Sequence, residues 1–182
     1  MTVKETKLKG CYVIQPSIFS DKRGYFIESF NQKTFNSKLN LDISFVQDNE
    51  SQSSKGVLRG LHYQSGIYAQ AKLVRVVKGR VLDVAVDMRL GSETFGEHIS
   101  IELTEANKTQ LFVPRGFAHG FIVLENETIF SYKCDNFYNK ESETGVIYND
   151  KDLNINWQLP VSDFILSEKD LVLPEFKKAE KC

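Results

Sequence analysis

The chain has 182 residues, of which 41% are hydrophobic, and its 23 basic and 24 acidic side chains leave a formal net charge of −1. This length and composition allow a full hydrophobic core, so they exclude a disordered chain and a disulfide-stapled mini-protein. The balanced charge lacks the basic footprint of a nucleic-acid-binding protein, so no nucleic-acid partner is expected. We expect one domain over residues 1–182, with a frayed, charged tail after about residue 175.

Short runs rich in Val, Ile, Phe and Tyr recur between turn residues along the chain, which is typical of β-strands. Strands are expected over residues 11–14, 25–30, 44–47, 57–64, 72–77, 80–88, 98–103, 110–113, 119–124 and 128–134. The Lys78-Gly79 pair predicts a tight hairpin. Only residues 33–39 and the region around 162–170 have a helical pattern. The sequence therefore predicts an all-β, mainly antiparallel fold of the sandwich, barrel or jelly-roll type.

The strand over residues 80–88 shows the clearest alternation of side chains. Leu82, Val84 and Val86 share one face, whereas Asp83 and Ala85 lie on the other.

The cysteines and the first residues bear on the cellular compartment. Cys11, Cys134 and Cys182 stand far apart, without a C-x-x-C pair, which is typical of reduced thiols in the cytoplasm. The first ten residues contain no apolar segment of a signal peptide, and no uncharged run is long enough to span a membrane. We expect a cytoplasmic protein with no membrane partner.

His62 is the first candidate for chemistry. It lies in VLRGLHYQ, on the strand face predicted to hold Leu58, Gly60 and Gln64. An isolated histidine is most often a hydrogen-bonded core residue, but charged residues of the same region favour a functional site. These are Arg59, Lys72, Arg75 and Asp83.

A metal site is not expected. The segment PRGFAH, which ends at His119, resembles the second motif of the cupin jelly roll. Metal-binding cupins usually supply an H-x-H pair and a glutamate from their first motif. The corresponding stretch here has His62, Tyr63 and Gln64, so the second ligand is missing.

Proton transfer is the chemistry that remains. His62 is a candidate base near neutral pH, and a tyrosine or lysine could act as the acid or stabilise an oxyanion. Tyr132 and Lys72 are candidates for these roles. From spacing alone, Tyr132 could equally be a core aromatic residue and Lys72 an edge lysine.

Several segments in order resemble one known family. DKRGYFIESFN, FVQDNESQSSKGVLRGLHYQ, AKLVRVVKGRVLDVAVDMR, FVPRGFAHGF, YKCDNFY, NDKDLNINW and LSEKD together resemble the dTDP-4-dehydrorhamnose 3,5-epimerases over residues 9–174. The resemblance implies a cupin-type jelly-roll homodimer without a metal or other cofactor. It also implies that dTDP-4-dehydro-6-deoxy-D-glucose is inverted at C3 and C5 to dTDP-4-dehydro-L-rhamnose, with an exchanged strand bringing nucleotide-binding residues across the dimer interface.

The resemblance also implies catalytic roles. His62 of RGLHYQ is the implied base, Tyr132 of SYKC the acid and Lys72 of AKLVR the donor to the developing O4 enolate. Asp170 of SEKD is the implied carboxylate that orients His62. Asp83 remains an alternative for that role.

Substrate-binding residues follow from the same motifs. Arg23 and Arg59 would bind the diphosphate, which suits guanidinium geometry. Glu28, Gln47 and Asn49 would bind the thymine and neighbouring groups, and Tyr138 would stack on the base. The pocket would be completed by Lys72, His119, Glu143 and Lys169.

Two positions depart from the family pattern, and two other functions remain open. Glu50 stands where the family often has histidine, and Arg115 where it has an acidic or neutral residue. Similar catalytic residues would also serve an epimerase of another nucleotide-linked 4-keto sugar, or one acting at C3 or C5 only. A non-catalytic cupin that binds a nucleotide sugar is the third possibility.

Overall fold

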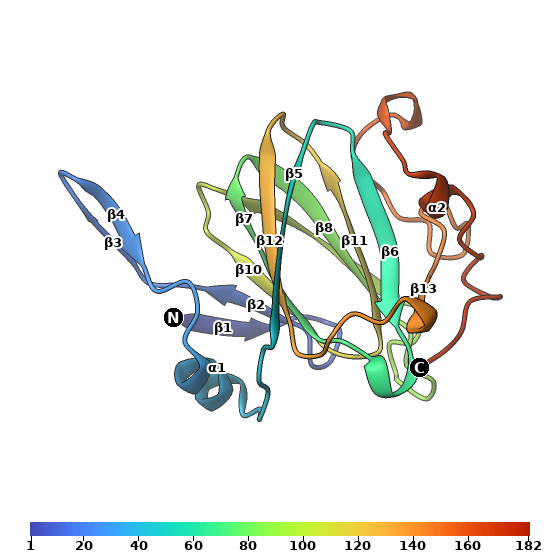
Figure 1. Ribbon diagram of the computed structural model, residues 1–182, viewed down its shortest axis with the longest axis horizontal. Helices are drawn as coiled ribbons and strands as arrows, with labels where there is room; N and C mark the ends of the chain where they lie inside the picture. Colours follow the sequence, from blue (N-terminus) through green and yellow to red (C-terminus); the bar gives the residue numbers. More distant parts are fainter.

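The computed structural model describes residues 1–182, and two antiparallel sheets that face each other form its body (Figure 1). One sheet runs in the order β1 (Thr2–Glu5), β2 (Tyr12–Gln15), β10 (Gln110–Val113), β7 (Lys72–Lys78), β12 (Thr128–Cys134) and β5 (Gln47–Ser53). The other runs β13 (Glu143–Gly145), β6 (Leu58–Gln64), β11 (Phe117–Val123), β8 (Arg80–Asp87) and β9 (His98–Thr104). This architecture confirms the predicted all-β jelly roll.

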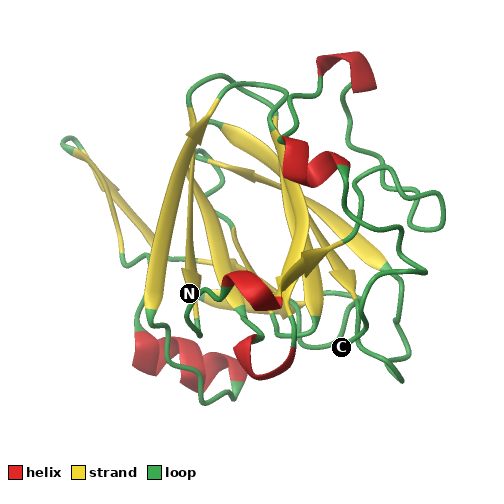
Figure 2. Cartoon of the chain, turned by 45° about the vertical axis from the view of Figure 1, so that its right-hand side comes forward, coloured by secondary structure: helices red, strands yellow, loops and turns green.

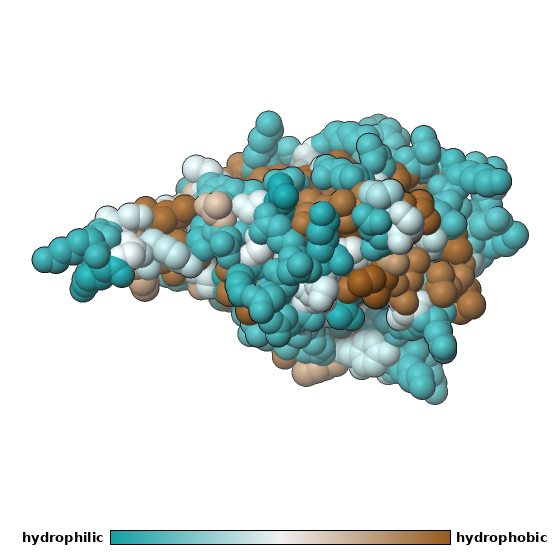
Figure 3. Space-filling model, turned by 90° about the horizontal axis from the view of Figure 1, so that it is seen from above, coloured by the Kyte–Doolittle hydropathy of each residue, from teal (hydrophilic) through white to brown (hydrophobic).

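A separate hairpin projects from the body of the molecule (Figures 1 and 3). It consists of β3 (Ile18–Asp21) and β4 (Gly24–Ile27), and only β4 was expected from the sequence. Its large apolar side chains are exposed, with Phe19 at 63% and Phe26 at 68%. The hairpin therefore presents apolar surface that nothing within the same chain covers.

The helices are short, and one prediction needs correction. Helix α1 (Gln32–Leu39) begins where Asn31 accepts a hydrogen bond from the Thr34 backbone N–H, close to the predicted start. The helix expected around residues 162–170 is instead a 3₁₀ turn, η3 (Val161–Asp163), followed by a bridge at Ile165 and a single turn, α2 (Glu168–Leu171). Ile165 pairs with Val57, and this pairing interrupts the helix. Two further 3₁₀ turns are η1 (Gly66–Tyr68) and η2 (Lys140–Ser142).

Strand β8 is buried on both faces. Leu82 and Val84 face outward into a cluster with Trp157 of the C-terminal segment, whereas Val81 and Ala85 point between the sheets. Figure 2 shows that C-terminal segment mostly as loop. On the other side of the molecule, α1 covers the outer face of the six-stranded sheet through Phe35 and Leu39.

The chain after residue 175 is packed rather than frayed, which corrects the expectation from its charge. The Cys182 N–H donates to the Met88 carbonyl at 2.9 Å, and the Leu90 N–H donates to the Cys182 carbonyl at 2.7 Å. Ala179 is only 5% exposed. Backbone hydrogen bonds beside the end of β8 therefore hold residues 176–182 in place, although many of their side chains are charged. No helix of the structure is long and apolar enough to cross a membrane.

Candidate active site

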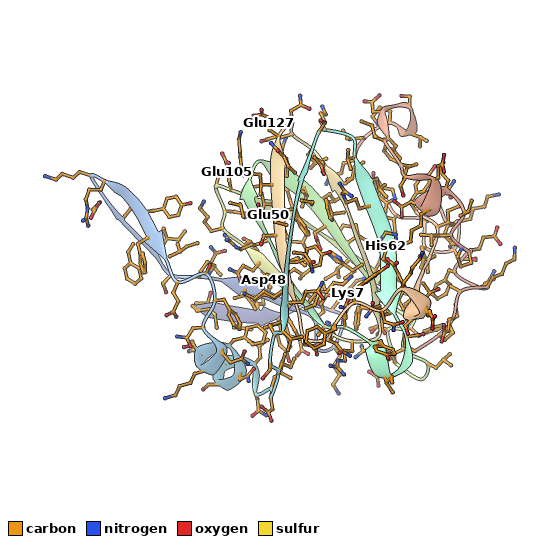
Figure 4. All side chains as sticks on the ribbon, viewed as in Figure 1. Lys7, Asp48, Glu50, His62, Glu105 and Glu127 are labelled. Atoms are coloured by element: carbon orange, nitrogen blue, oxygen red, sulfur yellow. The ribbon has the colours of Figure 1, made fainter.

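Two adjoining cavities, of about 270 and 400 Å³, open between the two sheets. Both are lined by Asn49 of β5, His62 of β6, Lys72 of β7 and Tyr132 of β12. Figure 4 shows His62 on β6 and, on β5, Asp48 and Glu50. The jelly roll thus brings together these four side chains, although Asn49 and Tyr132 are 83 positions apart in the sequence (132 − 49 = 83).

An irregularity in β6 turns Arg59 and His62 into the same cavity. The pairing of β6 with β11 shifts register between His119 and Phe121, so the simple alternation along β6 is broken. Leu58, predicted to share a face with His62, instead packs into the outer core. Gly60 is required here, because a Cβ would lie 2.6 Å from Gly120 Cα.

His62 is held by a carboxylate. Its Nε2 lies 2.5 Å from Asp170 Oδ1, and Ser167 Oγ donates to Asp170 Oδ2 at 2.8 Å. Burial acts to raise the pKa of Asp170, but the hydrogen bonds from His62 and Ser167 outweigh it and lower that pKa. Because a carboxylate can only accept, it fixes the proton on Nε2 and leaves Nδ1 as the basic nitrogen.

Asp83 pairs with a different histidine. His119 Nε2 lies 3.0 Å from both carboxylate oxygens of Asp83, and both side chains are buried. Burial raises the pKa of Asp83, although His119 acts in the opposite direction. The sequence left Asp170 and Asp83 as alternatives for orienting His62, and the geometry assigns that contact to Asp170.

Tyr132 and Lys72 come from the sheet opposite His62. The Lys72 Nζ lies 6.0 Å from the centre of the Tyr132 ring. Burial lowers the pKa of Lys72 and raises the pKa of Tyr132, because each is harder to charge away from water. The phenol therefore stays protonated, and the ammonium supplies positive charge beside it.

The smaller cavity has a polar, partly aromatic wall. The Tyr138 hydroxyl donates to Glu143 Oε2 at 2.8 Å, and Lys169 Nζ lies 2.5 Å from the same oxygen. Burial acts to raise the pKa of Glu143, but these two contacts lower it overall. Gln47 Nε2 donates to Asn49 Oδ1 at 3.0 Å. These groups offer hydrogen-bond donors and acceptors beside an exposed aromatic ring.

Most predicted binding residues meet at these cavities, but two do not. Arg59 lines the larger cavity, and its Nη2 donates to Ser53 Oγ at 3.2 Å. Arg23 lies on the projecting hairpin and is paired with Asp21 at 2.6 Å. Glu28 follows that hairpin and accepts from Asn31 Nδ2 at 3.1 Å. Within one chain, neither Arg23 nor Glu28 reaches the cavities.

Sequence analysis missed several groups at the site. Ser167 supports Asp170 and caps α2, and the spacing Ser-x-x-Asp in SEKD is a recognisable capping signal. Cys134, Gln64 and Gln70 line the smaller cavity, and no sequence pattern marks them. Burial raises the pKa of Cys134 to about 11, so its thiol stays protonated.

The donor set at the cavities is poor for a metal ion. Of the three histidines, only His62 and His119 line the cavities. No group of three or more His, Cys, Asp or Glu side chains in the structure is arranged to hold a metal.

Comparison with known proteins agrees with this geometry. The sequence model of the dTDP-4-dehydrorhamnose 3,5-epimerase family matches residues 5–178. The enzyme of that name from Shigella flexneri is 50% identical over 180 residues, covering 99% of this chain and 98% of its own.

Solved structures of this family share the fold. That of dTDP-4-dehydrorhamnose 3,5-epimerase from Elizabethkingia anophelis has a TM-score of 0.94 and 59% identity, covering 97% of both chains. A dTDP-6-deoxy-D-glucose-3,5-epimerase from Legionella pneumophila, in complex with dTDP-4-keto-L-rhamnose, has a TM-score of 0.94 and 46% identity, covering 97% of this chain and 93% of its own. The chain described here belongs to the dTDP-4-dehydrorhamnose 3,5-epimerase family.

Proposed function

We propose that this chain inverts C3 and C5 of dTDP-4-dehydro-6-deoxy-D-glucose and releases dTDP-4-dehydro-L-rhamnose. One observation carries the mechanism: a carboxylate-held histidine on one sheet and a protonated tyrosine on the other line the same cavities. Inversion needs proton removal from one face of a ring and delivery to the opposite face. His62 and Tyr132 would flank a sugar ring in this way.

The C4 ketone makes the protons on both neighbouring carbons acidic. His62 Nδ1 removes one of them. The electron pair of that C–H bond forms a double bond to C4, and negative charge develops on O4. The Lys72 ammonium stabilises that enolate, since a preorganised positive charge acts most strongly where charge develops. Tyr132 then gives a proton to the other face as the charge on O4 re-forms the ketone. Exchange with water takes the proton from His62 and reprotonates Tyr132, and the second carbon then follows by the same steps. Only protons move, so the reaction consumes no oxidant or reductant.

Asp170 supports the base in this scheme. Its Oδ1 lies 2.5 Å from His62 Nε2 and accepts a hydrogen bond from it. The carboxylate charge then stabilises the imidazolium that forms when Nδ1 takes the substrate proton. The nucleotide would lie along the smaller cavity. There Tyr138 would stack on the thymine, and Gln47 and Asn49 would contact it. The diphosphate would extend toward the adjoining larger cavity, where Arg59 would bind it. The pocket would be completed by His119, Glu143 and Lys169.

A second copy of the chain would supply Arg23 and Glu28. These residues lie on or beside a hairpin whose apolar side chains are exposed, and such a surface favours burial against another molecule. We propose a homodimer in which each hairpin reaches the partner's nucleotide site. Light scattering should give a dimer at micromolar concentration, and a stable monomer would contradict this.

Mixing two inactive variants tests the exchange directly. His62→Asn and Arg23→Ala should each lose activity as homodimers, but after exchange of subunits half of the dimers carry one intact site. Activity should then return to at most about a quarter of the wild-type value. No recovery after verified exchange would show that both residues serve the same chain's site.

The cytoplasm is the proposed location. Cys11, Cys134 and Cys182 are all unpaired, as expected in a reducing compartment. No membrane or nucleic-acid partner is part of the proposal.

The decisive experiment uses the proposed substrate in D₂O. Deuterium should appear at both C3 and C5, as located by NMR. Incorporation at only one carbon would indicate a single-site epimerase, and none at either carbon would indicate a binding protein. Tyr132→Phe should keep solvent exchange on the face of His62, while inversion falls by a factor on the order of 10² to 10⁴.

A further inference from the structure

Lys72 lies at the very start of a strand, although its proposed role requires accurate placement. It is the first residue of β7, and the preceding residues 66–71 form a turn and a loop. None of the ion pairs in the structure includes Lys72. The position of its ammonium therefore depends on the backbone from which its long side chain extends.

Asp135 fixes that backbone through two hydrogen bonds to one residue. The Asp135 N–H donates to the Ala71 carbonyl at 3.1 Å, and the Ala71 N–H donates to Asp135 Oδ1 at 2.6 Å. The strand ladder itself ends one step earlier, at the pair of Cys134 with Lys72. Asp135 thus extends the pairing of β7 with β12 past Lys72, so that Lys72 is no longer at its end.

Arg115 completes this arrangement from a third segment. It lies between β10 and β11, and its Nε donates to Asp135 Oδ2 at 2.8 Å. The Asp135 side chain is only 7% exposed, so its negative charge needs a partner, and Arg115 provides one. Both carboxylate oxygens are therefore used in holding the start of β7.

Neighbouring contacts tie the same two segments together. Gln70 Nε2 donates to the Asn136 carbonyl at 2.8 Å, and Asn136 Nδ2 donates to the Ile67 carbonyl at 2.9 Å. The loop before Lys72 is thus attached to the residues after β12 at several points. Of the side chains that make these contacts, only Asp135 bonds to Ala71, the residue before Lys72, and only Asp135 is charged.

We propose that Asp135, held by Arg115, is a positioning residue that fixes Lys72 for the reaction. The inference rests on the proposed role of Lys72 in stabilising the enolate. A misplaced ammonium would stabilise the transition state less while leaving substrate binding nearly intact, because the nucleotide contacts are made by other residues.

Asp135→Asn is the sharpest variant. An amide offers only one acceptor oxygen, so either Ala71 N–H or Arg115 Nε must face a donor instead of an acceptor. We expect kcat to fall roughly tenfold, less than the 10² associated with a displacement of about 1 Å, with KM within about twofold. Asp152→Asn is the control for losing an ion pair as such, because Asp152 pairs with Lys177 at 3.0 Å, is more exposed than Asp135 and lines neither cavity. It should keep the wild-type kcat.

A double-variant cycle separates positioning from general damage. If Asp135 acts through Lys72, the Asp135→Asn change should cause no further loss in a Lys72→Ala background. Losses that multiply in the double variant would overturn the inference, as would a wild-type kcat for Asp135→Asn. If Asp135→Asn does not fold by circular dichroism, Arg115→Gln takes its place, with a smaller loss of kcat that must also vanish without Lys72.

The single variants keep the two proposals apart. Wild-type activity in Lys72→Ala would refute the role of Lys72 and the inference with it. Loss of activity in Lys72→Ala, together with wild-type kcat in both Asp135→Asn and Arg115→Gln, would refute the positioning role alone.

Discussion

Two histidine–carboxylate pairs lie at the larger cavity, made of the same residue types in different surroundings. His62 is 24% exposed and Asp170 4%, with a separation of 2.5 Å. His119 is 6% exposed and Asp83 0%, and Nε2 is equidistant, at 3.0 Å, from both carboxylate oxygens. Both members of the first pair line the cavity, whereas of the more deeply buried second pair only His119 does.

The environments also act on the two carboxylates in opposite directions. Hydrogen bonds from His62 and Ser167 lower the pKa of Asp170 despite its burial, whereas burial raises the pKa of Asp83. A strongly ionised Asp170 suits a histidine that must gain and lose a proton. The more deeply buried pair suits a side chain held in one position for binding. The same residue types thus acquire different tasks from burial and hydrogen bonding.

Replacing the two histidines should separate these tasks most clearly. His62→Asn removes the base, so turnover should fall by a factor on the order of 10² to 10⁴ and deuterium uptake should vanish at both carbons. His119→Asn should keep solvent exchange and act mainly through a higher KM. Steady-state kinetics and NMR in D₂O measure both. Rapid exchange in His62→Asn would make Lys72 the next candidate base.

The two carboxylates should separate in the same way, with smaller effects. Asp170→Asn keeps an acceptor for His62 but removes the charge that stabilises the imidazolium. We expect kcat to fall about 10- to 100-fold with little change in KM. Asp83→Asn should instead lower stability, by roughly 1–3 kcal/mol, because His119 Nε2 lies 3.0 Å from both carboxylate oxygens and the amide would leave a buried N–H donor without an acceptor.

Denaturant unfolding of both variants, alongside their kinetics, provides the measurement. A larger kcat loss in Asp83→Asn than in Asp170→Asn would reverse the assignment of the two pairs.

Strand patterns predicted the strands of His62 and His119 but not their carboxylate partners, and only the family resemblance implied that Asp170 orients His62. Strand β11 lies between β6 and β8, so Asp83 on β8 reaches His119 on β11 but not His62 on β6. Asp170 comes from a single helical turn 108 positions after His62. Such contacts depend on sheet order and on how the C-terminal segment packs, and local periodicity carries neither.

Strand β5 shows why the cavity wall was harder to predict than the core. Its sequence, QDNESQS, has no apolar residue, because one face lines a polar cavity and the other meets solvent. The strand predicted here, over residues 44–47, overlaps β5 only at Gln47. In contrast, β8 has apolar neighbours on both faces, and its alternation was read correctly. A strand that lines a polar cavity has no apolar pattern, and for this reason most of the strand that carries Gln47 and Asn49 was not predicted.

The decline of activity at high pH should distinguish Asp83 from Asp170. Its position on the pH scale should change in one variant and stay the same in the other. Burial lowers the pKa of Lys72, while Cys134, Asp83 and Glu143 act to raise it. Since the proposed role of Lys72 requires the ammonium, activity should decline with rising pH below the ordinary lysine range of about 10.4.

Removing the charge of Asp83 should move that decline to still lower pH. Asp170→Asn should leave its position unchanged while reducing the rate at every pH. Profiles of kcat against pH for the three proteins provide the measurement. An equal displacement in both variants would show that the decline reports some other group.

The smallest expected effect concerns Ser167, which supports only the first pair. Its hydroxyl donates to Asp170 Oδ2 at 2.8 Å and accepts from the Asp170 backbone N–H at 3.2 Å, so it holds the carboxylate and caps α2. Ser167→Ala should lower kcat by a few-fold and stability by about 1 kcal/mol, which is typical of a lost helix cap. Ser167→Thr keeps the hydroxyl and should restore most of both. In the Asp170→Asn background, Ser167→Ala should no longer change kcat, since the carboxylate it supports is gone. A full Ser167→Ala effect on kcat in that background would mean that Ser167 acts on the cavity by itself and not through the His62 pair.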